Sequence, residues 1–253
     1  GKVWIKVDTG MNRLGFMPEH LADVMQQIMP CLSQTQQEEL VLCSHFSNSE
    51  EKNNPKTLNQ IQCFDNLNSA YHCQTSLANS AGIIHWPQSR RDFNRLGIAL
   101  YGINPSMESH CLDSVSNADI ALKPVMTLQS NIIGLRTLAK GDSVGYGEAW
   151  QAKRNSVIAT VAIGYADGYP RNAQAGTPVF VNNQLAPLAG RVSMDMITVD
   201  VTDLPEVKLG DVVELWGSNL PVETIAEHVG TISYELLTRV SIRLPKVHIE
   251  VAN

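Results

Sequence analysis

The pattern of apolar segments changes character near residue 117, and this change constrains the fold more than any other feature of the chain. Apolar strand patterns cover residues 3–7, 40–43, 76–78 and 98–102, and amphipathic helical patterns cover residues 20–29 and 57–71. Strands and helices in alternation predict a parallel sheet with crossover helices. Four such strands would make half of a (β/α)8 barrel, whose sites lie at the carboxyl ends of the strands.

The second part of the chain has the pattern of a β domain. Its strand patterns are separated by Gly, Pro and Asn turns and cover residues 125–135, 156–163, 178–181, 184–188, 196–201 and 212–215. Short strands at this spacing predict an all-β domain, with a helix from Pro221 and another near Ser233. The polar segment 106–119 is a predicted linker. The predicted fold class is therefore α/β plus all-β, with domains at 1–116 and 117–253.

Composition narrows the function classes. The 253 residues carry a net charge of −6, which argues against a nucleic-acid partner because such proteins present a basic stripe. No apolar run approaches 18 residues, so no membrane span is predicted. The five cysteines form no C-x-x-C pair, and we expect neither a metal site nor a redox pair. Free thiols fit a reducing cytosol, and we expect a cytoplasmic protein.

The first residues contain two features with competing interpretations. Gly1 opens directly on a buried-strand pattern, without a methionine or a signal peptide, and we expect the chain to be part of a longer one. Lys6 lies inside that apolar strand, where burial of an unpaired ammonium costs free energy. The alternative interpretation is a lysine on an edge strand whose ammonium reaches solvent. The tripeptide from Asp8 to Gly10 matches the active site of aspartic proteases. Those enzymes need two such carboxylates, and only one copy is present.

Polar groups follow the predicted strands at several points. Asn79-Ser80-Ala81-Gly82 and Asn94-Arg95-Leu96-Gly97-Ile98 offer hydroxyl, amide and backbone N–H groups that suit a phosphate, although Asn and Ser also commonly make turns. In the β domain, the run GYADGYPR packs two tyrosines around an Asp-Gly pair. The simple interpretation of that run is a hairpin turn.

Seven motifs, taken together, resemble the alanine racemase family. In chain order they are KVDTGMNRLGF, ANSAG, GIALYGINP, VGYG, GYADGYPR, GRVSMDM and SYELLTR. They extend from one end of the chain to the other. The resemblance implies the second half of a (β/α)8 barrel that binds pyridoxal 5'-phosphate (PLP), followed by a C-terminal β domain. It also implies that the first four barrel strands and the Schiff-base lysine lie outside this chain.

The resemblance implies a role for each matching residue. Tyr165 takes the position of the catalytic tyrosine, which removes the α-proton of L-alanine, while the lysine serves the opposite face. Arg95 faces the pyridine nitrogen of PLP and, because arginine does not give up its proton, leaves that nitrogen unprotonated. The family usually has Pro after this arginine, and this chain has Leu96, which loosens the loop slightly.

Further residues are implied around the cofactor and the substrate. Phosphate is held by Ser80, by the N–H groups of Gly97 and Ile98 and by the Tyr234 hydroxyl, with His45 near the cofactor ring. Arg13 meets the substrate carboxylate and Met194 offers a backbone N–H. Lys6 resembles a carbamylated lysine that positions Arg13, since a carbamate replaces the buried cation by an anion.

The resemblance implies interconversion of L- and D-alanine by a homodimer, which supplies D-alanine for peptidoglycan. Tyr165 and Met194 would reach into the partner's barrel. Two alternatives stay open. One is a serine or broad-specificity racemase of the same fold, and the other is a PLP-binding or dimerising fragment without turnover, because this chain lacks the cofactor lysine. We expect the chain by itself to fold poorly, since half a barrel exposes sheet edges.

Overall fold

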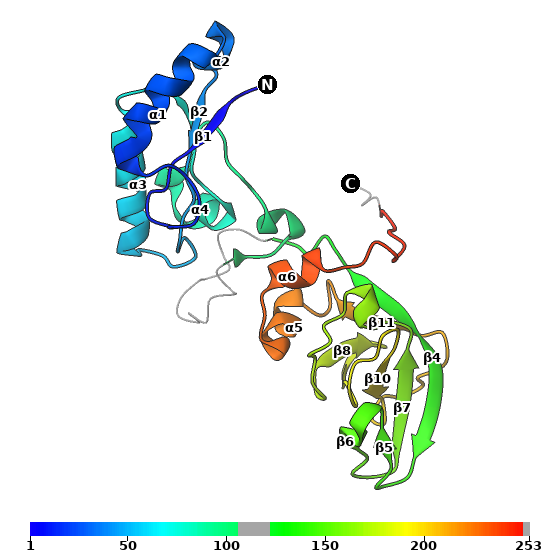
Figure 1. Ribbon diagram of the computed structural model, residues 1–253. Coiled ribbons are helices and arrows are strands. Elements are labelled where there is room, and N and C mark those ends of the chain that lie inside the picture. Colours follow the sequence, from blue (N-terminus) through cyan, green and yellow to red (C-terminus); the bar gives the residue numbers. More distant parts are fainter. Residues whose placement is uncertain (106–121, 250–253) are drawn as a thin grey trace. The chain divides into compact units, whose positions relative to one another are not determined.

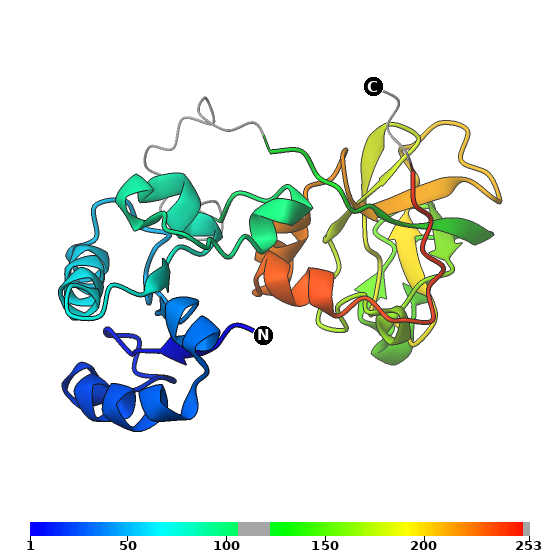
Figure 2. The same cartoon turned by 90° about the horizontal axis from the view of Figure 1, so that it is seen from above.

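The structure is a computed structural model that describes residues 1–105 and 122–249. The chain divides into two compact units, Gly1–Leu122 and Lys123–Asn253 (Figures 1 and 2). The predicted domain boundary at 116/117 and the whole of the predicted linker 106–119 lie outside the described residues. Each unit is considered by itself below.

The first unit is built on a parallel sheet of three strands in the order β1-β2-β3. The strands are β1 (Trp4–Lys6), β2 (Val41–Cys43) and β3 (Gln74–Ser76), and the α-helices are α1 (Leu21–Ile28), α2 (Gln34–Glu38), α3 (Pro55–Asn68) and α4 (Ser80–His85). Short 3₁₀ helices occupy Pro18–His20, Met29–Cys31, Pro87–Ser89 and Ile98–Tyr101. The predicted alternation of strand and helix is confirmed.

Side-chain caps fix where these helices begin. The Asn54 side chain accepts a hydrogen bond from the backbone N–H of Lys56 at 2.8 Å, and Pro55 takes the first helical position of α3. The Asn79 side chain accepts from the N–H of Gly82 at 2.8 Å at the start of α4. Each cap satisfies an amide that has no partner inside the helix, which is why Asn and Pro stand at these positions.

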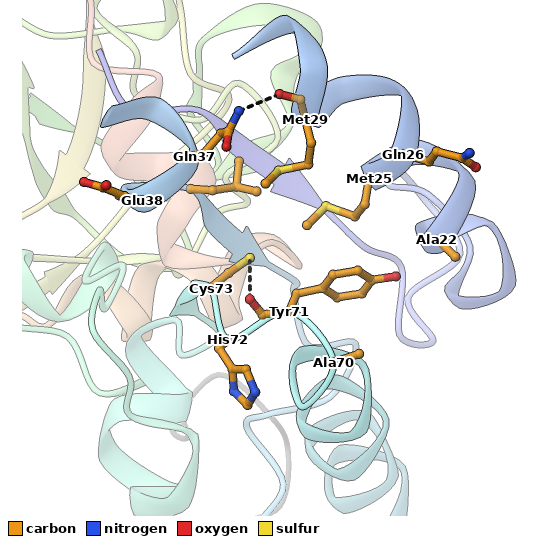
Figure 3. A pocket seen from close by; sticks show the side chains of 11 residues that line it. Ala22, Met25, Gln26, Met29, Gln37, Glu38, Ala70, Tyr71, His72 and Cys73 are labelled. Atoms are coloured by element: carbon orange, nitrogen blue, oxygen red, sulfur yellow. Dashed lines mark hydrogen bonds between the residues drawn. The ribbon is translucent and has the colours of Figure 1, made fainter. Parts of the chain in front are cut away.

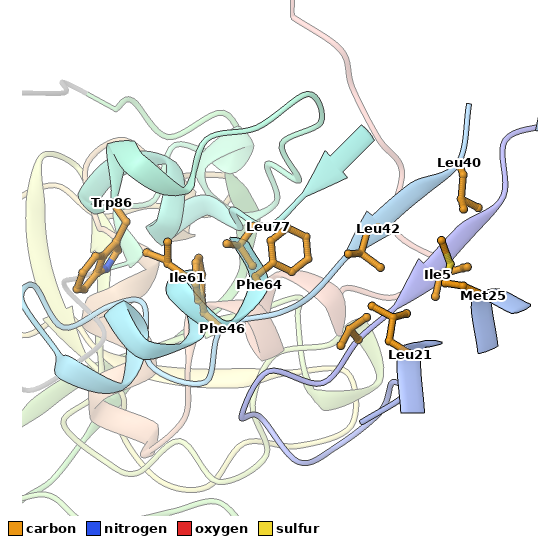
Figure 4. Close-up of a cluster of buried hydrophobic side chains, with 11 residues drawn as sticks. Ile5, Leu21, Met25, Leu40, Leu42, Phe46, Ile61, Phe64, Leu77 and Trp86 are labelled. Atoms are coloured by element: carbon orange, nitrogen blue, oxygen red, sulfur yellow. The ribbon is translucent and has the colours of Figure 1, made fainter. Parts of the chain in front are cut away.

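One apolar cluster joins the sheet to its helices (Figure 4). Its buried members are Ile5, Val7, Leu21, Met25, Leu40, Leu42, Phe46, Ile61, Phe64, Leu77 and Trp86. They come from the strands, the helices and the residues next to them in the chain. Burial of this surface stabilises the sheet and thereby fixes the carboxyl ends of its strands.

The prediction of a fourth strand at 98–102 is wrong. These residues form a 3₁₀ helix that ends at Gly102, whose φ is +82°. The place beside β3 is taken by a shorter extended segment, because Phe93 N–H donates to the Thr75 carbonyl at 3.0 Å and Arg95 N–H donates to the Ala78 carbonyl at 2.9 Å. Phe93 forms a parallel bridge with Ser76. The apolar residues 98–101 therefore form a helical turn just after the extended segment that lies beside β3.

The second unit is a closed β structure with two helices. Its six-stranded sheet has the order β10-β7-β4-β11-β8-β9. The strands are β4 (Leu128–Leu138), β7 (Ser156–Val161), β8 (Pro178–Val181), β9 (Gln184–Pro187), β10 (Ile197–Asp200) and β11 (Val212–Trp216). An antiparallel bridge between Leu188 and Val199 joins the two outer strands. The sheet therefore closes on itself, which removes its exposed edges.

The sequence prediction holds for this unit, with two omissions. All six predicted strands are present within a few residues, and helices α5 (Val222–Val229) and α6 (Ser233–Thr238) follow them. A small hairpin of β5 (Ser143–Val144) and β6 (Trp150–Gln151) was not predicted, nor were the 3₁₀ helices at Tyr146–Glu148 and Tyr165–Asp167. Among the described residues, no helix is long and apolar enough to cross a membrane.

Candidate functional site

The carboxyl ends of the parallel strands bring most of the predicted site residues of the first unit to one edge of the sheet. Residues from Asp8 follow β1, His45 follows β2, and Ser80 follows β3. Arg95 follows the extended segment that bridges to β3. Since parallel strands end at the same edge, this edge is where an α/β fold builds a site.

Arg95 is the centre of this edge. Its guanidinium donates to the Ser76 hydroxyl at 2.6 Å, to the Ser44 carbonyl at 2.6 Å and to the Leu77 carbonyl at 3.3 Å. These partners are neutral, so the contacts fix the orientation of the guanidinium without cancelling its charge. Burial lowers the pKa of Arg95 from its usual value. A guanidinium stays protonated all the same, and it has five N–H donors, so donors remain for a ligand.

His45 lies against Arg95 as a neutral side chain. The Arg95 Nη2 atom is 3.3 Å from His45 Nδ1. Because a guanidinium can only donate, Nδ1 accepts, and the ring hydrogen is assigned to Nε2. Burial, together with the positive charges of Arg95, Arg13 and Lys6, lowers the pKa of His45 to about 4. The structure therefore brings three of the predicted site residues, Arg95, Arg13 and Lys6, into electrostatic range of the His45 imidazole.

The Asp8 carboxylate shapes the loop that carries Arg13. One oxygen of Asp8 accepts from the N–H groups of Gly10, Met11 and Asn12 at 2.9, 2.9 and 3.0 Å, and the other accepts from Arg13 N–H at 3.0 Å. Although burial alone would raise the pKa of Asp8, these four hydrogen bonds hold it below its usual value. The carboxylate is fully engaged by its own loop, which disfavours the aspartic-protease interpretation.

Lys6 is half-buried at the end of β1, opposite Cys43 of β2 in the parallel register. Burial raises the pKa of the Cys43 thiol, while the charges of Arg95 and Lys6 act in the opposite direction. Lys6 stands on an edge strand of the sheet and is partly exposed, so both interpretations of this lysine stay open. It lies beside the same cationic edge.

Ser80 holds the turn that follows Arg95. Its buried hydroxyl accepts from Gly97 N–H at 2.9 Å and from Ala99 N–H at 3.4 Å. Both acceptor positions of the hydroxyl are then used, and its hydrogen is left to donate. The predicted role of the Gly97 amide differs from this arrangement, because the amide is engaged by Ser80. Ile98, the next residue, is buried at the start of the 3₁₀ helix.

Tyr165 and Met194 are brought together in the second unit by their backbones. Tyr165 N–H donates to the Ser193 carbonyl and Ala166 N–H donates to the Met194 carbonyl, both at 3.0 Å. A Cβ atom at Gly164 would lie 2.3 Å from each of these two carbonyl oxygens. Only glycine permits this approach. The side chains of Tyr165 and Met194 are both exposed, at 37% and 54%.

An ion-pair network that the sequence analysis missed joins the same two loops. Arg243 Nε lies 2.7 Å from Asp167, which follows Tyr165 by two residues, and its Nη2 atom lies 2.6 Å from Asp195. The Asp167 carboxylate also accepts from Gly164 N–H at 2.8 Å. The available signal was the pair of acidic residues inside the GYADGYPR and GRVSMDM motifs, of which Asp167 is buried and therefore needs a partner for its charge.

Tyr234, the last predicted site residue, lies in the first turn of α6 with its side chain 38% exposed. The helix begins at Ser233, as predicted, and Ile232 is its N-cap residue. Three of the predicted site residues thus belong to the second unit and seven to the first. Among the described residues, no group of three or more His, Cys, Asp or Glu side chains could hold a metal.

A cavity of about 530 Å³ lies at the other end of the parallel sheet. Its lining includes Leu40 and Cys73, which directly precede β2 and β3, together with Met25, Met29 and Tyr71 (Figure 3). These positions mark the amino ends of the strands. In barrels of this type, residues at that end serve stability. The cavity is therefore separate from the edge that carries Arg95 and His45.

Comparison with known proteins agrees with this geometry. Residues 1–105 match the family description "Alanine racemase, N-terminal domain", and residues 125–248 match "Alanine racemase, C-terminal domain". The chain belongs to the alanine racemase family. This confirms the predicted family and fold class, a TIM-type barrel portion followed by a C-terminal β domain.

Relatives of known structure extend the agreement. The biosynthetic alanine racemase of Pseudomonas aeruginosa has a crystal structure that is 46% identical, with a TM-score of 0.88 over 98% of this chain and 67% of that one. An alanine racemase from Bartonella henselae, solved with covalently bound pyridoxal phosphate, is 32% identical, with a TM-score of 0.85 over 97% of this chain and 66% of that one.

Curated relatives are longer than this chain. The alanine racemase of Alteromonas mediterranea is 44% identical over 245 residues, which are 97% of this chain and 65% of that protein. The chain thus spans a little under two thirds of the length of such relatives.

Proposed function

We propose that this chain forms part of a PLP-dependent alanine racemase that interconverts L- and D-alanine. The observation that carries the proposal is the environment of Arg95, a half-buried guanidinium held only by neutral partners beside a neutral imidazole. Such a cation suits a ligand that presents an acceptor nitrogen, and the Ser80 hydroxyl at the same edge of the sheet suits its phosphate. The proposal rests equally on membership in the family and on the motifs that carry it.

The residues at this edge fit PLP. Arg95 would donate to the pyridine nitrogen and keep it unprotonated, since arginine does not release its proton. Ser80 would donate its remaining hydroxyl hydrogen to the phosphate, and His45 would lie near the ring as a neutral group. The Gly97 and Ile98 amides and the Tyr234 hydroxyl complete the proposed phosphate donors, with Gly97 exchanging its bond to Ser80.

When bound, PLP supplies an aldehyde that joins the substrate amine and a ring that draws electrons from the α-carbon. Tyr165 would remove or return the α-proton on the face that belongs to L-alanine. Arg13 would bind the substrate carboxylate, with Lys6, in a carbamylated form, positioning it. Met194 would contribute a backbone N–H to the substrate.

Racemisation requires a second base on the opposite face, because one base returning the proton to its own face changes nothing. We propose that this base is the lysine that attaches PLP, carried in the part of the relatives' length that this chain does not span. We further propose a homodimer in which Tyr165 and Met194 serve the partner's barrel. The proposed product, D-alanine, would be made in the cytosol and supply peptidoglycan.

The experiment is solvent-deuterium incorporation at the α-carbon by the complete enzyme carrying Tyr165→Phe. Loss of the phenol should slow exchange from L-alanine by about 100-fold or more, and slow exchange from D-alanine much less, because a positioned acid–base group contributes about that factor. Tyr71→Phe, which changes a tyrosine at the amino ends of the strands, is the matched control and should exchange normally. Equal losses from both enantiomers would contradict the assignment, and faster exchange of serine than alanine would favour the serine-racemase alternative.

A further inference from the structure

Helix α3 buries an amide side chain among apolar residues. Gln60 is 2% exposed, and its helix neighbours Ile61 and Phe64 belong to the apolar cluster of the first unit (Figure 4). Burial of an amide costs free energy unless its polar atoms find partners. An apolar residue at position 60 would pack without that cost, so the reason for an amide here lies in the hydrogen bonds that it makes.

The Gln60 amide uses its whole capacity for hydrogen bonds, two acceptor positions and two N–H donors. Its Oε1 atom accepts from the N–H group and from the hydroxyl of Ser47, at 3.0 and 3.1 Å. Its Nε2 atom donates to the His45 carbonyl at 3.0 Å and to the Thr9 hydroxyl at 3.5 Å. A backbone N–H can only donate and a carbonyl can only accept, so these contacts also decide which end of the amide faces which partner. The side chain is therefore held in one orientation.

Thr9 and Gly10 connect Gln60 to the loop after β1. The Thr9 hydroxyl, which accepts from Gln60, also lies 2.8 Å from the Ser44 hydroxyl. Gly10 has a φ of +131° and brings its backbone over the amide, because a Cβ atom placed there would lie 3.5 Å from Gln60 Cγ and 3.9 Å from Nε2. This loop continues to Arg13, the residue proposed to bind the substrate carboxylate.

His45 and Ser47 connect Gln60 to the loop after β2. The amide holds this loop at two points, the His45 carbonyl and the Ser47 N–H group. The Arg95 Nη2 atom lies 3.3 Å from Nδ1 of the His45 ring and donates to the Ser44 carbonyl at 2.6 Å. The backbone next to Gln60 thus supplies two of the contacts that orient the Arg95 guanidinium.

We propose that Gln60 is a positioning residue for the proposed racemase reaction, and that it fixes the loop of Arg13 relative to the loop of His45. One loop would bind the substrate carboxylate and the other would lie near the cofactor ring, so their spacing decides how a bound substrate lies against PLP. The inference rests on the proposed function for these two roles. Both enantiomers of alanine share the carboxylate and the ring, and loss of Gln60 should therefore slow both directions alike.

The test is solvent-deuterium incorporation at the α-carbon by the complete PLP-bound enzyme carrying Gln60→Met. Methionine has a similar volume and removes all four hydrogen bonds. Exchange from L-alanine and from D-alanine should both slow by about tenfold or more, because misplacement of reacting groups by about 1 Å has an effect of at least that size. Gln60→Glu keeps the shape and the acceptors but removes the donor to the His45 carbonyl, and it should slow both directions as well.

Thr57→Val is the matched control on the same helix. The Thr57 hydroxyl is buried and donates to the Asn48 carbonyl at 2.8 Å, so this change also removes a hydrogen bond between α3 and the loop after β2. The bond lies farther along the loop from His45. Thr57→Val should lower the midpoint of urea denaturation, while both exchange rates stay close to those of the unaltered enzyme.

NMR titration of the His45 ring in the same variants measures position without turnover. Burial and the nearby positive charges lower the pKa of His45 to about 4. A loop that moves away from Arg95 should raise the titration midpoint toward the ordinary value of about 6.5 in Gln60→Met, and Thr57→Val should leave the midpoint unchanged.

Three results would overturn the proposal: exchange in both Gln60 variants that is as fast as in the unaltered enzyme, a loss confined to one enantiomer, or an equal loss in Thr57→Val. If the unaltered enzyme does not exchange the α-proton of alanine, the proposed function itself fails. The His45 titration then decides by itself whether Gln60 holds the two loops, and a midpoint that is the same in Gln60→Met and in the unaltered protein overturns the inference.

Discussion

Replacement of Gly164 by alanine should separate the two loops that present Tyr165 and Met194. The backbone of Gly164 is extended, with φ of −149°, so its conformation itself is open to alanine. The cause of the expected damage is contact, since the new methyl group would lie 2.3 Å from the carbonyl oxygens of Ser193 and Met194. Relief requires a movement of about 1 Å, because carbon and oxygen atoms in contact normally stay more than about 3 Å apart.

Such a movement breaks the two backbone hydrogen bonds between the loops, each worth about 0.5–1.5 kcal/mol. Overpacking of a closed region adds about 1–3 kcal/mol. The free energy of unfolding should therefore fall by about 2–6 kcal/mol in Gly164→Ala, measured by urea denaturation. The proposed exchange of the α-proton should slow as well, since Tyr165 moves with its backbone.

Gly134→Ala is the matched control. A methyl group at Gly134 in β4 would lie 3.6 Å from Thr160, an ordinary contact. Alanine should leave stability unchanged or raise it by about 0.5–1 kcal/mol, because glycine inside a strand is the more flexible residue in the unfolded chain. If the free energy of unfolding changes in Gly164→Ala and in Gly134→Ala by amounts that agree within about 0.5 kcal/mol, the contact of the methyl group with the two carbonyl oxygens is not the cause of instability.

Three further predictions concern charged groups. Asp8→Asn should lower the free energy of unfolding by about 1–3 kcal/mol at pH 7 in urea titrations, because four amides lose a charged acceptor. Folding lowers the pKa of Asp8, so the difference in the free energy of unfolding between the unaltered protein and Asp8→Asn should shrink as the pH falls below 3.8. A difference that stays constant with pH would contradict this. The His45 ring, with a pKa of about 4, should show no NMR titration between pH 5.5 and 8. Its contribution to the free energy of unfolding should rise with pH from about 4 to 6.5. An NMR titration midpoint near pH 6.5 would contradict the lowered pKa. Arg243→Lys should speed amide hydrogen exchange in the loops of Asp167 and Asp195, because a single ammonium cannot bridge both, and unchanged exchange would refute the bridge.

The sequence predicted most of the secondary structure because hydrophobic period and turn residues decide it locally. Residues 178–181 form a strand with the predicted bounds, and residues 57–71 largely coincide with α3. The error at 98–102 has a physical cause. An apolar run of this length is consistent with either a strand or a turn of helix, and the amides of Gly97 and Ala99 are drawn to Ser80, which lies 17 residues or more earlier in the chain.

The sequence named candidate site residues, but it could not give the hydrogen bonds and ion pairs between them. The motifs identified Arg95 and His45, but the hydrogen bond between them spans 50 positions in the sequence. The same limit applies to Arg243, whose contacts with Asp167 and Asp195 span 76 and 48 positions. Such contacts depend on how the loops meet after folding, and a local pattern contains no information about that.

The two units hold their proposed functional groups in different ways, and this difference has consequences for variation. In the first unit, hydrogen bonds made by side chains hold the groups in place, because the Arg95 guanidinium donates to the Ser76 hydroxyl and the Ser44 carbonyl, and the Asp8 carboxylate accepts from the Arg13 N–H group. In the second unit, backbone pairs with backbone beside Gly164, and the side chains of Tyr165 and Met194 project from that frame. In the first unit, substitution of a polar side chain should therefore change the hydrogen bonds that hold Arg95 and the loop of Arg13. In the second unit, substitution of Gly164 should move the backbone that carries Tyr165 and Met194. Proton transfer to one face of the α-carbon depends on the position of the base as well as on its basicity, so we expect the close approach at Gly164 to affect the role proposed for Tyr165.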